Sequence, residues 1–147
     1  MKFHVLVLWC LVDVLSRPAI AAPPTWVEIP VGIKGSRNAF DSSSVTIDGA
    51  QRTAWVMISF DSTYRFEPDK TPTSKILVLM TFDCNRITVQ AMREIHYDPN
   101  GKPFYTVEQP TLQRAAAPKT VDRAQLDAVC AVPRKNWARR LLDLWVH

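Results

Sequence analysis

Lys75–Asn85, with the sequence Lys-Ile-Leu-Val-Leu-Met-Thr-Phe-Asp-Cys-Asn, is the stretch that decides the fold of this chain. Four apolar residues and a cysteine recur in it at every second position: Ile76, Val78, Met80, Phe82 and Cys84. Because side chains alternate between the two faces of a β-strand, this spacing places all five on one face. The face ends in a sulfur atom that can hold another element against it, and we expect Cys130 to be its partner.

The size and composition of the chain fit one globular domain. A domain of 147 residues can bury roughly two-thirds of its unfolded surface and needs no metal to fold. The formal net charge of +4 is mild and does not by itself indicate a nucleic-acid partner. The 4 glycines and 11 prolines favour a few defined turns and stiff connections over a flexible chain.

The first 21 residues have the pattern of an export signal. A weakly basic start precedes the apolar run Val5–Leu15, and Ala19-Ile20-Ala21 matches the small-x-small pattern that signal peptidase accepts. The run is interrupted by Asp13 and is shorter than the ~20 apolar residues that a membrane span needs. We therefore expect a signal peptide over residues 1–21, with a retained anchor or a buried first helix as the alternative.

The cysteines indicate one disulfide bond in the mature chain. Cys10 lies within the apolar run, where the bulky Trp9 before it argues against a lipid-attachment site. Removal of the signal leaves Cys84 and Cys130, and an even pair in an exported chain favours a disulfide over two buried free thiols. The bond would close a loop of about 47 residues, which contributes about 4 kcal/mol in the chain-entropy model.

Short strand patterns separated by turn residues fill the chain from Thr25 to Val107. The strands are expected at Thr25–Ile29, Ser36–Asp41, Val45–Ile47, Arg52–Asp61, Lys75–Asn85, Ile87–Tyr97 and Pro103–Val107. Asp48-Gly49 and Asp98–Gly101 carry the residue types that tight turns prefer. Asp61–Ser74 contains two prolines and several polar residues, so we expect it to be an exposed loop.

The two central strands are expected to form a hairpin with a tight turn at Asn85-Arg86. Apolar residues occupy even positions as far as Cys84 and odd positions from Ile87, which is the change of parity that a tight turn requires. The expected cross-strand pairs are Phe82 with Val89, Met80 with Ala91, and Ile76 with Ile95. This register places His96 on the polar face of its strand.

A helix is expected over Val121–Val129. Thr120 can cap its first turn, and Asp122 lies near its positive end. Leu126 and Val129 share one helical face with Cys130. The disulfide would therefore clamp this helix onto one side of an antiparallel sheet, which defines an α+β fold.

Pro133–His147 has the pattern of a basic amphipathic helix. Trp137, Leu141 and Leu144 share one face of such a helix. The residues that would contact a partner protein or anionic lipid are Arg134, Lys135, Trp137, Arg139 and Arg140. The alternative is a final helix packed on the domain, which is the usual role of an apolar helical stripe.

The sequence contains no strong catalytic or metal-binding pattern. His96 and His147 are the histidines of the mature chain, so we expect no metal, no cofactor and no enzymatic activity. Ser42-Ser43-Ser44 has no base nearby in sequence, and a triad would have to use His96. Glu94 and Glu108 could lie close on adjacent strands, as glycosidase carboxylates do, but charged residues are normal on a solvent face. Basic and aromatic residues are not interleaved, so no nucleic-acid platform is expected.

The order of these features resembles the surface-adhesin protein E family of Gram-negative bacteria. The matching features are Trp26, Phe40-Asp41, Val45–Gly49, Trp55, Asp83-Cys84 followed by Arg86, Tyr97-Asp98 before Gly101, Pro118-x-Thr120 and Val129-Cys130. Together they extend from Thr25 to Cys130, which is most of the mature chain. The tail from Pro133 onward lies outside the resemblance.

The resemblance implies an antiparallel sheet of about six strands with one helix tied to it by a disulfide between Cys84 and Cys130. It also implies an exported protein of the periplasm or outer-membrane surface that binds a host matrix or envelope protein. The expected segments are a signal peptide at 1–21, an adhesin-like domain at 22–132 and a basic tail at 133–147. The alternative function is a periplasmic accessory subunit that docks through this tail.

Overall fold

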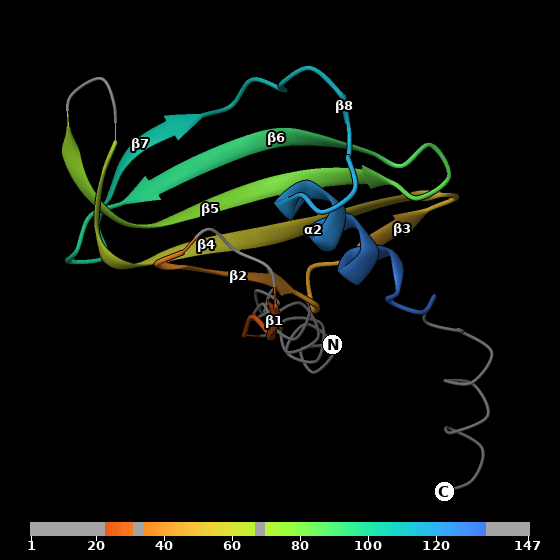
Figure 1. The fold of residues 1–147 in the computed structure, drawn as a ribbon, viewed down its shortest axis with the longest axis horizontal. Helices are drawn as coiled ribbons and strands as arrows, with labels where there is room; N and C mark the ends of the chain where they lie inside the picture. The colour runs from red at the N-terminus through yellow and green to blue at the C-terminus, as the bar shows by residue number, and fades with distance from the viewer. Residues whose placement is uncertain (1–22, 31–33, 67–69, 135–147) are drawn as a thin grey trace, which may run out of the picture.

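One antiparallel sheet with a helix across one face forms the framework of the protein (Figure 1). The computed structural model describes residues 23–30, 34–66 and 70–134. The elements are β1 (Trp26–Ile29), β2 (Ser36–Asp41), β3 (Thr46–Asp48), β4 (Gln51–Phe66), β5 (Thr71–Asp83), β6 (Thr88–Tyr97), β7 (Pro103–Val107), β8 (Arg114–Ala115) and α2 (Val121–Cys130). The predicted signal peptide and the tail from residue 135 lie outside the described residues.

The strand order confirms the predicted α+β fold. Six strands form the path β1-β2-β4-β5-β6-β7, while β3 pairs with β4 and β8 pairs with β6. All these pairings are antiparallel. Within the described ranges, no helix is long and apolar enough to cross a membrane.

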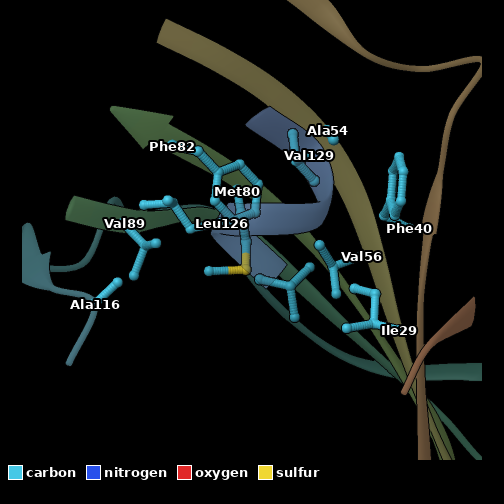
Figure 2. Packing of buried hydrophobic residues seen from close by; sticks show 11 residues of the cluster. Ile29, Phe40, Ala54, Val56, Met80, Phe82, Val89, Ala116, Leu126 and Val129 are labelled. Carbon is cyan, nitrogen blue, oxygen red and sulfur yellow. The ribbon is translucent and has the colours of Figure 1, made fainter. Parts of the chain in front are cut away.

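The hydrophobic core lies between α2 and the face of the sheet that carries the even-numbered residues of β4 and β5. Its buried members include Ala54, Val56, Met80, Phe82, Val89, Leu126 and Val129. Figure 2 shows Leu126 and Val129 of α2 among the side chains of the three central strands. The predicted apolar face of the central strand is therefore the surface on which the helix packs.

Two local features hold α2 in place, and both agree with the prediction. Cys84 and Cys130 form a disulfide with a Cα–Cα distance of 5.9 Å, which joins the end of β5 to the end of the helix. At the other end, the backbone N–H of Arg123 donates a hydrogen bond of 3.2 Å to Oγ1 of Thr120. The helix is therefore fixed at its first turn by a cap and at its last turn by a covalent bond.

Most of Asp61–Ser74 belongs to the strands β4 and β5, so the prediction of an exposed loop there was wrong, while residues 67–69 of this range lie outside the described residues. The strand pairing of β4 with β5 resumes after an irregularity and matches Tyr64 with Thr73 and Phe66 with Thr71. Pro72 is compatible with this arrangement because it lies beyond Lys75, where the pairing of β5 with β6 ends. At that point β5 has one neighbouring strand, so a missing N–H can face away from the ladder.

The hairpin between β5 and β6 has a longer turn than predicted. Asp83 pairs with Thr88, so four residues connect the strands instead of two. Oδ1 of Asp83 accepts hydrogen bonds from the backbone N–H groups of Asn85 (3.1 Å) and Arg86 (2.9 Å). The left-handed residue of the turn is Ile87, with φ of 58°, and not Asn85. The carboxylate of Asp83 therefore organises a turn that the apolar pattern alone did not reveal.

A β-bulge at Met92 changes the face on which the second half of β6 points its side chains. Ala91 pairs with Met80 and Arg93 pairs with Leu79, which leaves Met92 without a partner on β5. The predicted pairs of Phe82 and Met80 are confirmed, but Ile76 pairs with His96 and not with Ile95. Because one extra residue reverses the alternation, Glu94 and His96 lie on the helix-facing side of the sheet.

The opposite face of the sheet carries half-buried apolar residues from three strands. Trp55 pairs with Leu79, and Met57 pairs with Leu77, which in turn pairs with Ile95. These positions alternate with core residues, so they point away from α2. Among the described elements, no helix or strand packs on this face.

Candidate functional site

A trough of ≈ 340 Å³ lies between the N-terminal half of α2 and the sheet. Its floor consists of apolar side chains from the three central strands: Ile58, Ile76, Val78, Met80 and Ala91. In Figure 1, α2 crosses the strands near one end of the sheet and leaves the other end uncovered in that view. The floor is thus the part of the core face that extends beyond the helix.

One wall of the trough contains a buried pair of amides. Asn38 on β2 is 1% exposed and Gln125 on α2 is 2% exposed. Nε2 of Gln125 donates a hydrogen bond of 3.4 Å to Oδ1 of Asn38. Nδ2 of Asn38 has no hydrogen-bond partner within the described part of the chain. This buried donor belongs to a residue that lines the trough.

The other wall contains the carboxylate of Glu94, which contacts a buried histidine. His96 is 1% exposed, and its Nε2 lies within hydrogen-bonding distance of Oε1 of Glu94. The His96 ring is enclosed by aromatic rings, with centroid distances of 4.2 Å to Phe66, 5.3 Å to Tyr105 and 6.0 Å to Phe104. A hydrogen on Nε2 would donate to Glu94, and the packed rings hold this donor in position.

An ion pair closes the trough on the side of the helix N-terminus. Nε of Arg114 lies 2.6 Å from Oδ2 of Asp122, and the second guanidinium nitrogen lies 2.9 Å from Oδ1. The hydrogen bond to Asp122 raises the pKa of Arg114 above its ordinary value, although burial opposes the shift. This bidentate geometry leaves both residues charged and mutually compensated.

The residues predicted to contact a partner are only partly covered by the structure. Arg134 lines a second hollow of ≈ 380 Å³ with Ser42, Val45, Ile47, Gly49 and Val132. A guanidinium nitrogen of Arg134 donates a hydrogen bond of 2.7 Å to the carbonyl oxygen of Gly49. Lys135, Trp137, Arg139 and Arg140 lie outside the described residues, so their role stays a prediction.

The three serines weighed for catalysis form a structural turn around Asp41. Oδ1 of Asp41 accepts hydrogen bonds from the backbone N–H of Thr25 (2.8 Å) and from the N–H (2.9 Å) and hydroxyl (2.6 Å) of Ser43. The Ser44 hydroxyl donates to the carbonyl oxygen of Asp41 at 2.7 Å. Burial acts to raise the pKa of Asp41, but these hydrogen bonds, that of the Ser43 side chain foremost, hold the pKa below its usual value.

The two glutamates weighed as a carboxylate pair point to opposite sides of the sheet. Glu94 lines the trough, whereas Oε1 of Glu108 lies 3.0 Å from a guanidinium nitrogen of Arg93. Arg93 pairs with Leu79 and therefore belongs to the face away from α2. In the described part of the chain, no group of three or more His, Cys, Asp or Glu residues could hold a metal ion.

The trough was missed at the level of sequence because the bulge at Met92 cannot be read from alternation alone. Without the bulge, Glu94 and His96 fall on the solvent face, and the floor continues as a plain apolar stripe. The detectable signals were Asn38, a polar residue on a mostly buried strand, and Gln125, which lies next to Leu126 on the buried side of the helix.

The described residues define a class of fold: an antiparallel sheet with a disulfide-clamped helix packed on its core face. The chain belongs to the surface-adhesin protein E family, whose model matches residues 26–131. This membership confirms the resemblance based on the ordered sequence features, and it places the chain among adhesin-like proteins of the cell surface.

Solved structures of Haemophilus influenzae protein E have a similar fold. The crystal form II structure has a TM-score of 0.54 and 16% identity, covering 73% of this chain and 96% of that chain. The selenomethionine form has a TM-score of 0.56 and 16% identity, covering 78% of this chain and 92% of that chain. No curated protein sequence matches the chain.

Proposed function

We propose that this protein is an exported, non-enzymatic binding protein of the Gram-negative cell envelope, with a host matrix protein or another envelope protein as its partner. The observation that carries the proposal is the adhesin-family match over residues 26–131, which includes both disulfide cysteines. The disulfide supports export, because such bonds form in oxidising compartments. The pattern of a signal peptide at 1–21 supports the same location in the periplasm or on the outer-membrane surface.

A direct binding measurement tests this proposal. The mature protein, with its disulfide intact, is immobilised and exposed to purified matrix proteins and then to a solubilised envelope extract. We expect saturable binding to at least one of them. Reduced and alkylated protein serves as the control, since an interaction that needs the folded sheet should be lost. Absence of binding in both sets would contradict the proposal.

A second proposal, a periplasmic accessory subunit, is supported by the position of Arg134. Its hydrogen bond to Gly49 fixes the point at which the basic tail leaves the domain, beside the hollow under β3. Truncation after Arg134 keeps this contact and removes the predicted amphipathic segment. We expect the full mature chain to elute with a larger envelope complex in size-exclusion chromatography and the truncated chain to elute separately from that complex. An unchanged elution profile after truncation would count against docking through the tail.

The tail is also the segment for which we propose peripheral contact with anionic lipid. Flotation with vesicles of phosphatidylglycerol tests this contact, and vesicles of phosphatidylcholine provide the neutral control. We expect the full mature chain to float with the anionic vesicles and the truncated chain not to float. Equal behaviour of the two chains would remove the tail from consideration as a lipid-binding segment.

A further inference from the structure

We infer that the trough beside α2 is a binding site for a small organic amine, with the apolar body of the ligand on the sheet and its ammonium group at Glu94. This site is separate from the protein-binding role proposed above. It combines an apolar floor, one carboxylate whose described partner is the histidine His96 and not a lysine or arginine, and one unsatisfied buried donor, and each of these constrains the ligand.

The floor determines that the ligand has an apolar body. Ile58 and Ile76 are only half-buried, although they continue the row of core residues from β4 and β5. A ligand that covered them would remove apolar surface from water, which is favourable by about 25 cal/mol per Å². The volume of ≈ 340 Å³ is at the lower end of the range for small-ligand sites, ~300–1,000 Å³. A compact ring or short branched chain fits this space.

The charges of the lining residues determine the sign of the polar group. Arg114 and Asp122 neutralise each other through two hydrogen bonds. Glu94 is the other ionisable residue in the described lining, and its side chain is 33% exposed. Its contact is to His96 on the same strand, which leaves the second carboxylate oxygen available to a ligand. A carboxylate or phosphate ligand would be repelled here, whereas an ammonium group would be attracted.

The buried amide of Asn38 gives the ligand a second polar contact. Its Nδ2 has no partner among the described residues, and leaving a buried donor unsatisfied is costly. An acceptor atom on the ligand, such as an ether or carbonyl oxygen, would satisfy it. The aromatic rings around His96 hold the histidine, and through it the Glu94 carboxylate, in place before the ligand arrives.

An isosteric ligand series tests the inference on the full mature protein with its disulfide intact. Cyclohexylmethylamine, cyclohexylmethanol and cyclohexanecarboxylate have similar apolar bodies but carry a positive, neutral and negative group. Titration followed by ¹H–¹⁵N correlation spectra should show saturable shifts at Asn38, Glu94 and Gln125 with the amine. We expect the amine to bind at least about tenfold more tightly than the alcohol, which corresponds to about 1.4 kcal/mol, and the carboxylate not to bind.

Three variants assign the effect to the trough. Glu94→Gln preserves shape and a contact to His96, so it should reduce the affinity for the amine to that for the alcohol. Ala91→Leu fills the floor and should abolish binding of both. Glu108→Gln removes a carboxylate from the opposite face and should change neither affinity. Equal binding of all three ligands, shifts elsewhere in the protein, or full amine affinity in Glu94→Gln would overturn the inference.

Discussion

Gln125 of α2 reaches across the core face and donates a hydrogen bond to Asn38 of β2, a residue 87 positions earlier in the chain. It is a buried polar contact between the helix and the sheet, beside a cluster of buried apolar residues. The disulfide at Cys130 ties one end of the helix, so the polar contact of Gln125 adds a second constraint on the orientation of its apolar face. We therefore regard this pair as a determinant of how α2 lies on the sheet.

Replacement of Gln125 by leucine should destabilise the protein by about 1–3 kcal/mol, because Asn38 then loses its only described side-chain partner while it stays buried. Urea unfolding at neutral pH measures this loss. The double variant Asn38→Leu, Gln125→Leu removes both polar groups and should recover part of the stability. A loss in the double variant equal to the sum of the losses in the two single variants would show that the pair does not act as a unit.

Removal of the disulfide by Cys84→Ala with Cys130→Ala should lower the free energy of unfolding by about 4 kcal/mol. The closed loop has a sequence separation of 46 residues, and the chain-entropy model gives this value for a loop of that length. Chemical denaturation of the mature protein measures the effect. Mass spectrometry of the non-reduced mature protein is the control, and two alkylatable sulfhydryl groups there would contradict the structure.

The sequence predicted the parts of the fold that depend on simple periodicity. Alternation from Ile76 to Phe82 correctly identified the core face, and the residue spacing of α2 identified its buried side. An even pair of cysteines outside the predicted signal peptide, in a chain expected to be exported, was enough to predict the disulfide. The strand and helix periodicities are local, so no knowledge of neighbouring strands was needed to predict them.

The candidate trough was not predictable, because it depends on an irregularity. A β-bulge is created when two residues of one strand face one residue of its neighbour, and Met92 has no property that marks it for this role. The extension of β4 through Tyr64 and Phe66 was missed for a related reason. Proline residues indicated a loop there, whereas the position of Pro72 beyond the end of β6 makes it compatible with a strand.

Deletion of Met92 should remove the bulge and leave Glu94 and His96 on the helix-facing side, because Arg93 can then follow Ala91 directly and keep its pairing with Leu79. The deletion should therefore cost no more than about 3 kcal/mol, the usual range for a single change. Thermal unfolding and the solubility of the purified protein measure the outcome. Met92→Ala keeps the extra residue and serves as the control for loss of the side chain, and a loss beyond about 4 kcal/mol in the deletion alone would contradict the assignment of Met92 as the extra residue.

Asp41→Asn should lower stability at neutral pH, and the difference from the wild-type protein should disappear in acid. Hydrogen bonds from Thr25 and Ser43 hold the pKa of Asp41 below its unfolded value, so the carboxylate stabilises the folded state above about pH 4. This contribution is lost as the pH falls through the lowered pKa, where both states become protonated. Urea unfolding between pH 7 and pH 2.5 measures this dependence of stability on pH.

The variant Ser43→Ala is the control, because it keeps the charge of Asp41 and removes one hydrogen-bond donor. It should give a smaller loss of stability with the same pH dependence. A loss in Asp41→Asn that stays constant down to pH 2.5 would show that packing, and not the charge of the carboxylate, stabilises the turn that joins β2 to β3.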